Sequence, residues 1–224
     1  MLQIWLSPSF PVGAYAYSHG LEMAAEQGLV RDHATLSAWL ENLIEFGSLR
    51  SDLILAAQAI RAVASGEWSR LGEIAELGAA LQPSSERYLE ATQQGRSFFE
   101  QVASAWPSPL LAEALTELRR GSSEIVVTYP VAFGLAAGAH GIPAVPALTA
   151  YGIAFIGNLA SASIRLSLIG QSEGQRLIAG LCAAVAAAAS RAEAARLEDL
   201  GTVTFRADLV SMQHERQYTR LFRS

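Results

Sequence analysis

Ser18 and His19 are the residues whose types come closest to a hydrolytic site, because a histidine base can activate a serine nucleophile. They are adjacent in the stretch SPSFPVGAYAYSHGLE, residues 7–22. Neighbouring side chains on a helix point about 100° apart, so this spacing does not predict a nucleophile–base pair. The sequence also contains no G-x-S-x-G nucleophile elbow. We predict no catalytic residue and keep a helical-bundle hydrolase or lyase using Ser18 and His19 as an alternative.

The remaining metal-ligating and nucleophilic side chains are scattered. No two histidines have the i, i+4 spacing of a helical metal site; they are His19, His33, His140 and His214. The single cysteine, Cys182, excludes an internal disulfide and a multi-cysteine zinc site. All sixteen basic residues are arginines, so there is neither a Schiff-base lysine nor a Walker A lysine. We expect no metal or cofactor to be bound by this chain alone.

Composition restricts the partners and the compartment. The net charge of −5 argues against non-specific nucleic-acid binding, which needs a basic face. The N-terminus has no secretory pattern, and together with the cysteine count this favours the cytoplasm. The chain is 51% hydrophobic, but a membrane span needs about 20 consecutive apolar residues. The run 177–189 is shorter, so no membrane span is predicted, and a membrane-associated helical protein stays a second alternative.

Apolar residues recur at three-to-four-residue steps along most of the 224 residues. This spacing predicts an all-α, single-domain bundle of roughly eight to ten helices, with two long helices over 146–168 and 173–197. The only β-like run, EIVVT at 124–128, is interpreted as an extended link or a helix start. Residues 1–200 are predicted to form the helical body, and residues 201–224 an arginine-rich C-terminal tail of the same domain.

The tail is the most informative charged region. Arginines 206, 216, 220 and 223 lie within its last nineteen residues. If residues 212–222 are helical, Arg216 and Arg220 share one face, and Tyr218, Leu221 and Phe222 lie beside them. Arginine next to aromatic and aliphatic side chains is typical of protein–protein interfaces. The pattern favours a docking segment over a frayed terminus.

Four motifs occur in order along the chain: SPSFPVGAYAYSHGLE, YPVAFGLAAGAHGIP, RLSLIGQSEGQ and HERQYTRLFRS. Together they resemble the UreF family of urease accessory proteins over essentially the whole length. The resemblance implies an all-helical protein that forms a homodimer and binds the accessory protein UreD, called UreH in some species. It further implies recruitment of the GTPase UreG, which binds GTP, and docking on the urease apoprotein. The complex then supports nickel insertion, so the expected role is non-enzymatic.

The same resemblance assigns roles to individual positions. It implies that the last motif is a partner-binding tail that becomes ordered on binding UreD, through His214, Glu215, Tyr218, Arg220, Leu221, Phe222 and Arg223. It places part of the partner surface in the first motif, at Ser9, Pro11, Gly13, Tyr15, Tyr17, Ser18 and His19. Arg165 and Gln171 are candidates for a buried polar contact or the dimer interface.

Two local expectations concern the first motif. Ser18 is expected to be the N-cap of the helix that follows. Ala14 stands where the family pattern usually has a second glycine. A left-handed backbone at this position would cost alanine about 1 kcal/mol or more.

Overall fold

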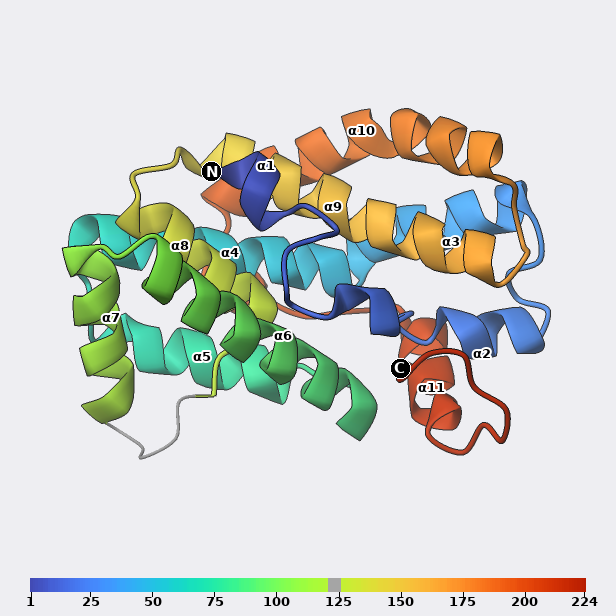
Figure 1. Cartoon of the computed structure of the whole chain (residues 1–224), viewed down its shortest axis with the longest axis horizontal. Coiled ribbons are helices and arrows are strands. Elements are labelled where there is room, and N and C mark those ends of the chain that lie inside the picture. The colour runs from blue at the N-terminus through green and yellow to red at the C-terminus, as the bar shows by residue number, and fades with distance from the viewer. Residues whose placement is uncertain (121–125) are drawn as a thin grey trace.

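The computed structural model describes residues 1–120 and 126–224, and every regular element in these ranges is a helix (Figure 1). The all-α prediction is therefore confirmed. The predicted extended link at 124–128 lies partly outside the described residues; Val126 to Thr128 lead into a helix without being helical. The elements are α1 (Leu2–Trp5), the 3₁₀ turn η1 (Ala14–Ala16), α2 (Leu21–Glu26), α3 (His33–Phe46), α4 (Ser48–Ser65), α5 (Arg70–Ala80), α6 (Ser85–Ala105), α7 (Pro109–Arg120), α8 (Tyr129–Ala139), α9 (Ala144–Arg165), α10 (Gln171–Ala194), η2 (Leu197–Asp199) and α11 (Phe205–His214).

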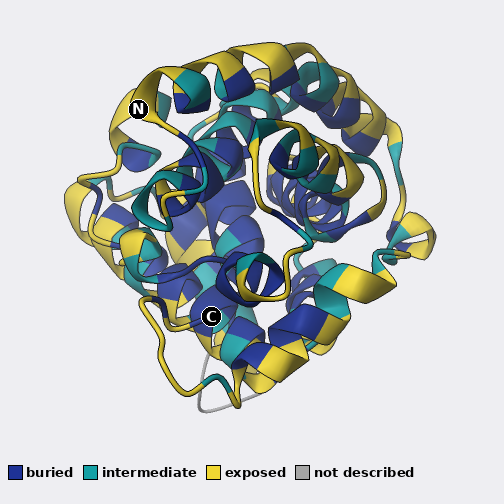
Figure 2. Ribbon diagram, turned by 90° about the vertical axis from the view of Figure 1, so that its right-hand side faces the viewer, coloured by how far each residue is buried: buried dark blue, intermediate teal, exposed yellow. Residues whose placement is uncertain are grey.

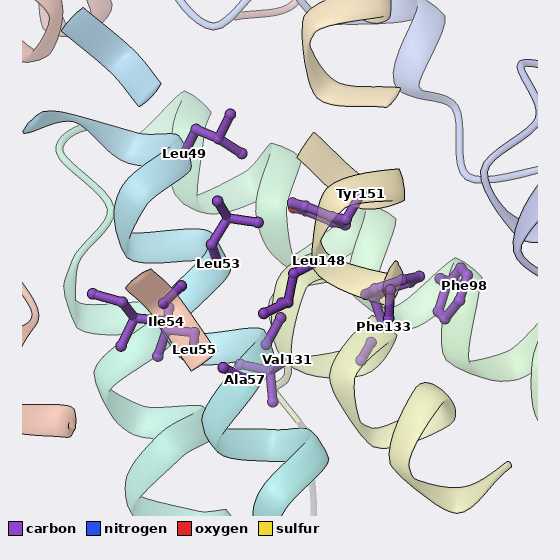
Figure 3. Packing of buried hydrophobic residues seen from close by; sticks show 14 of the residues in the cluster. Leu49, Leu53, Ile54, Leu55, Ala57, Phe98, Val131, Phe133, Leu148 and Tyr151 are labelled. Atoms are coloured by element: carbon purple, nitrogen blue, oxygen red, sulfur yellow. The ribbon is translucent and has the colours of Figure 1, made fainter. Parts of the chain in front are cut away.

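The core is built on the pair α4 and α8. All residues of α8 except its first are buried, as expected for a central helix without a polar face. A Cβ at Gly134 would lie 2.5 Å from the carbonyl oxygen of Ala56 on α4, so only glycine allows this approach. Figure 3 shows α4 side chains such as Leu53 and α8 side chains such as Phe133 meeting in the same cluster. Small residues bring the two backbones together, and large ones fill the space beside them.

Helices α9 and α10 pack as a long pair along one side of the bundle (Figure 1). They start two residues earlier and end three residues earlier than the apolar spacing predicts. Ser167 has a left-handed φ of 60°, and the Leu168 N–H donates to the Ser163 carbonyl, which closes the last turn of α9. Leu197, the expected end of the second helix, instead begins η2. Turn geometry, which spacing does not encode, set these boundaries.

Both helices of this pair are long and apolar enough to cross a membrane by length and composition alone. Protein covers 56% of the relevant window in α9 and 33% in α10. The core helix of a globular bundle passes the same test, so the finding is weak evidence for a membrane span. The outer face of α10 carries exposed small residues, among them Ala179, Ala183 and Ala187.

The first motif, up to the start of α2, folds as a strap of successive turns with η1 at its centre. Ala14 starts η1, and it is Gly13 before it that adopts the left-handed backbone, with φ 75°. Alanine at position 14 is therefore unstrained. The N-cap prediction for Ser18 is wrong: Gly20 is the N-cap of α2, and the Ser18 hydroxyl accepts from the Glu22 N–H at 3.3 Å. His19 has a left-handed φ of 58°, so the residues between Ser18 and α2 form a tight turn.

Candidate functional site

The first and last motifs are joined directly in the structure. The main-chain N–H of Ser18 donates to the Ser224 oxygen at 2.9 Å, and the Arg223 N–H donates to the Ala16 carbonyl at 2.8 Å. The chain end therefore lies beside the strap and α2 (Figure 1). The C-terminal segment, defined here as residues 214–224, has buried positions at His214, Phe222 and Ser224 (Figure 2). It is folded against the body, in contrast to the expectation that it is disordered without a partner.

The condition considered for the tail, a helix over residues 212–222, is not met. α11 ends at His214, and the chain continues through turns, so Arg216 and Arg220 do not share a helix face. The reason is that the segment bends back to reach α2. The main-chain N–H groups that a helix would bond internally are used elsewhere, including those of Leu221 and Phe222.

Glu22 on α2 holds this bend. Its carboxylate accepts from the N–H of Leu221 at 2.7 Å and from the N–H of Phe222 at 3.0 Å. The same carboxylate contacts Nε2 of His214 at 3.2 Å, and Nδ1 of His214 lies 2.6 Å from Glu86 on α6. The His214 side chain is fully buried between the two carboxylates. Glu22 on α2 and Glu86 on α6 thus contact His214, the first residue of the C-terminal segment, from two sides.

A second buried charge cluster on α6 lies beneath the last residue. Glu90 contacts the Arg87 guanidinium, accepts from the hydroxyl of Ser224, and lies 2.7 Å from Nδ1 of His19. Burial alone would raise the pKa of Glu90, but Arg87, His19 and the Ser224 hydrogen bond outweigh it and hold the pKa at about 2. Glu90 is therefore an anion at neutral pH, and it joins both motifs to the helical body.

Ser18 and His19 have structural partners that explain their types. The Ser18 hydroxyl donates to the Ser224 oxygen, and the side chain is fully buried. Burial, followed by the charge of Arg87, lowers the pKa of His19, whose ring packs edge-on against Phe155 at 4.7 Å. No hydrogen bond joins Ser18 to His19 in the described part of the chain. The arrangement gives no support to a hydrolase that uses this pair.

Arg165 connects the two motifs on the outer side. Its guanidinium carbon lies 3.6 Å from the ring centroid of Tyr15 and 4.2 Å from that of Phe222, and its side chain donates to the Tyr15 carbonyl. Gln171 is exposed, so it is not a buried polar contact, and it lines a shallow pocket of about 380 Å³ with Tyr15 and Arg165. Arg165 thus contacts both the first and the last motif, whereas Gln171 only lines the pocket beside them.

All the predicted partner-binding residues except the half-buried His19 fall into two sets. One set anchors the surface from inside and is buried: Tyr17, Ser18, His214 and Phe222. The other set is exposed and available for contact: Ser9, Pro11, Gly13, Tyr15, Glu215, Tyr218, Arg220, Leu221 and Arg223. Tyr218 is 102% exposed, so its side chain stands wholly in solvent, and Leu221 is 54% exposed. We call this second set the docking surface.

Sequence reasoning missed the charged residues that hold this surface. Glu22, Glu86, Arg87 and Glu90 are all carried by α2 and α6 and were assigned no role. The sequence carried a signal for one of them. Arg87 lies four residues before Ala91, on the apolar face of α6, so a charged residue stands at a core position. The C-terminal partners of Glu22, Glu86 and Glu90 lie more than a hundred residues away, beyond any helical spacing.

Among the described residues, no group of three or more histidine, cysteine, aspartate or glutamate side chains has the geometry to hold a metal ion. His214 faces two carboxylates, but they lie at opposite nitrogens of its ring. A single ion cannot reach both nitrogens, so this cluster serves hydrogen bonding.

Asp52 on α4 is a buried carboxyl outside the docking surface. Burial raises its pKa from 3.8 to about 7, although Arg87 and a 3.1 Å hydrogen bond from the Tyr151 hydroxyl oppose the shift. Between about pH 4 and pH 7 the folded protein retains a proton that the unfolded chain has lost, so the contribution of Asp52 to stability falls as pH rises.

We therefore expect the unfolding free energy of wild type minus that of Asp52→Asn to decrease by a few kcal/mol across this window and to level off above it. Urea denaturation at a series of pH values measures this difference. The exposed Glu113→Gln variant is the control and should follow wild type. Parallel curves for wild type and Asp52→Asn would mean that Asp52 is ionised in the folded protein.

Known proteins match this chain over nearly its whole length. A model of the UreF family matches residues 30–182. The protein of Methylobacterium radiotolerans named "Urease accessory protein UreF" is 52% identical over 223 residues, covering 100% of this chain and 95% of the relative. Proteins with the same name from Xanthobacter autotrophicus and Methylorubrum populi are 52% and 50% identical, covering 98% and 100% of this chain and 88% and 97% of the relatives.

Proposed function

Because the chain belongs to the UreF family of urease accessory proteins, we propose that it is a non-enzymatic scaffold for nickel insertion into apo-urease. In this role it binds UreD (UreH), and the complex recruits the GTPase UreG and docks on the urease apoprotein in the cytoplasm. GTP is bound by UreG, and nickel is the cargo of the complex. We further propose that the chain modulates the GTPase and contributes part of the nickel route.

One observation carries this proposal: the first and last of the four motifs of the family resemblance converge on one surface. Buried charges at Glu22 and Glu90 fix the C-terminal segment against the first motif. The residues left outside include Tyr15, Tyr218, Arg220 and Arg223, and tyrosine and arginine are types enriched at interfaces. A rigid surface of this composition loses little conformational entropy on binding, which favours a stable complex.

A homodimer is the second part of the proposal. The outer face of α10 exposes Ala179, Ala183 and Ala187 at i, i+4 spacing. Small side chains allow a second helix to approach closely, and the low charge of this face suits burial. The same face explains the long apolar character of α10 without a membrane.

The docking assignment is tested with single substitutions instead of deletion, because deletion of the segment would remove the hydrogen bonds that the buried Glu22 accepts from Leu221 and Phe222. We expect Tyr218→Ala and Leu221→Ala each to weaken the complex with purified UreD by about tenfold or more, because exposed apolar anchors dominate interface energy. The melting temperature should change little, since both side chains are exposed. Isothermal titration calorimetry gives the affinity and differential scanning calorimetry the stability.

Leu110→Ala on α7 is the matched control, because Leu110 is also an exposed leucine, at 38%, and lies at the opposite end of the bundle (Figure 1). It should bind UreD as wild type does. Wild-type affinity in both tail variants would place the UreD contact elsewhere on the chain. A wild-type protein that forms no complex with UreD would contradict the proposed function itself.

A further inference from the structure

A pocket outside the docking surface lies between α3 and the segment 203–207. It has a volume of about 460 Å³, within the range of sites that receive an apolar group. The N–H of Val203 donates to the Phe46 carbonyl at 3.0 Å, which holds the segment beside the end of α3. Leu29, Leu43 and Phe46 form part of the apolar wall, and Val203 and Phe205 form the other side.

The mouth of this pocket is unusually apolar for a free surface. Phe46, Val203 and Phe205 are 53%, 80% and 76% exposed. Leu209 and Met212 on α11 add exposed apolar surface beyond the pocket. A small molecule inside the pocket would leave these side chains in water, whereas a protein segment across it covers them. Clustered exposure of this kind marks a protein interaction site.

Two polar atoms of the pocket residues have no hydrogen-bond partner among the residues that the structure describes. Nε1 of Trp39 and Oγ1 of Thr204 are both shielded from solvent and unpaired. Buried polar atoms are nearly always paired in folded proteins, and leaving one unpaired costs about 1–3 kcal/mol. An indole N–H can only donate, so the missing partner of Trp39 is an acceptor such as a carbonyl or carboxylate oxygen.

The charge of the residues that line the pocket indicates a second feature of the occupant. Arg206 is the one charged residue among the described residues that line the pocket. No ion pair joins it to another side chain in the ranges that the structure describes, unlike Arg191, which pairs with Glu45 nearby in the fold. A free guanidinium at an apolar pocket complements a carboxylate next to an apolar anchor.

We infer that this pocket receives a large apolar side chain of the UreD-type partner, with an acidic residue of the same segment pairing with Arg206. The inference rests on the proposed function and extends it, because the pocket wall leads directly into α11 and then into the C-terminal segment. One partner lying along α11 contacts the pocket at the start of the helix and the docking surface beyond its end.

The experiment fills the pocket and reverses its charge. Ala38 is exposed in α3 and lines the pocket, so Ala38→Trp blocks entry without disturbing the core. Arg206→Glu repels the acidic residue and keeps the pocket open. We expect both variants to bind purified UreD about tenfold or more weakly than wild type, with an unchanged melting temperature. Arg206→Glu also keeps the test valid if Ala38→Trp folds poorly.

Matched controls lie on α7, away from the pocket (Figure 1). Ala112→Trp and Arg119→Glu repeat the same changes at exposed helical positions and should bind UreD as wild type does. Wild-type UreD affinity in both pocket variants overturns the inference, and a weakened Leu221→Ala complex in the same series would leave the proposed function standing. If Ala38→Trp no longer forms a homodimer but still binds UreD as wild type does, the inference is wrong and the pocket receives a second copy of this chain. No complex with wild type overturns both proposals.

Discussion

Glu90→Ala is expected to lower the free energy of unfolding by about 3–5 kcal/mol, the usual cost of breaking a buried ion pair from one side. Glu90 is 1% exposed, and its partner Arg87 is 6% exposed. With the carboxylate removed, the guanidinium stays buried with no described anionic partner. The neighbouring amide of Gln94, which donates to Glu90 at 3.2 Å, also loses its acceptor.

The same substitution should release the chain end. The hydroxyl of Ser224 donates to Glu90, and Ser224 in turn accepts from Ser18. We therefore expect the C-terminal segment of Glu90→Ala to exchange its amide hydrogens faster than that of wild type. Chemical denaturation measures the loss of stability, and hydrogen exchange with mass spectrometry locates it.

Glu100→Ala provides the control, because Glu100 is on the same helix and pairs with Arg96 at the surface. Exposed ion pairs contribute little, so its stability should stay within about 1 kcal/mol of wild type. A Glu90→Ala protein as stable as Glu100→Ala would mean that water or a rearranged side chain compensates Arg87. Unchanged exchange in residues 214–224 would show that the other contacts of the segment, such as those of Glu22 and Glu86, hold it without Glu90.

Gly134→Val is expected to destabilise the protein by more than about 3 kcal/mol, at or above the upper end of overpacking costs. A Cβ at this position would lie 2.5 Å from the Ala56 carbonyl oxygen and 2.8 Å from the Ala59 Cβ. Both obstacles belong to α4, and a carbonyl oxygen in a helix cannot move without breaking that helix. The α4–α8 contact must therefore widen, which opens space throughout the core (Figure 3).

Gly180→Val is the control that separates the steric clash at Gly134 from the effect of valine on helix propensity. Gly180 is exposed in the interior of α10, and a Cβ there meets nothing within 4 Å. Because valine is a slightly better helix former than glycine, stability should change by less than about 1 kcal/mol. Thermal unfolding by circular dichroism compares the two variants. If both variants lose the same stability, the loss is due to valine in a helix and not to the closeness of α4 and α8.

Local pattern and global position contributed differently to these predictions. The helix pair α9 and α10 was predicted to within three residues, because apolar spacing and small residues are properties of each helix alone. Its ends differed because Ser167 adopts a left-handed turn that spacing does not encode. The N-cap was placed on Ser18, a residue type that caps helices well, but the left-handed turn at His19 and Gly20 moves the start of α2 two residues further on.

The sequence by itself determined the helical class, the family through four ordered motifs, and the residue types of the docking surface. These follow from a 3.6-residue period and from short contiguous segments. Only the tertiary structure decided which of those residues are exposed and which are anchors. Glu22 contacts residues 221 and 222, and Ser18 contacts residue 224, across about two hundred positions. Contacts at that separation depend on how whole helices pack, and no local period records them.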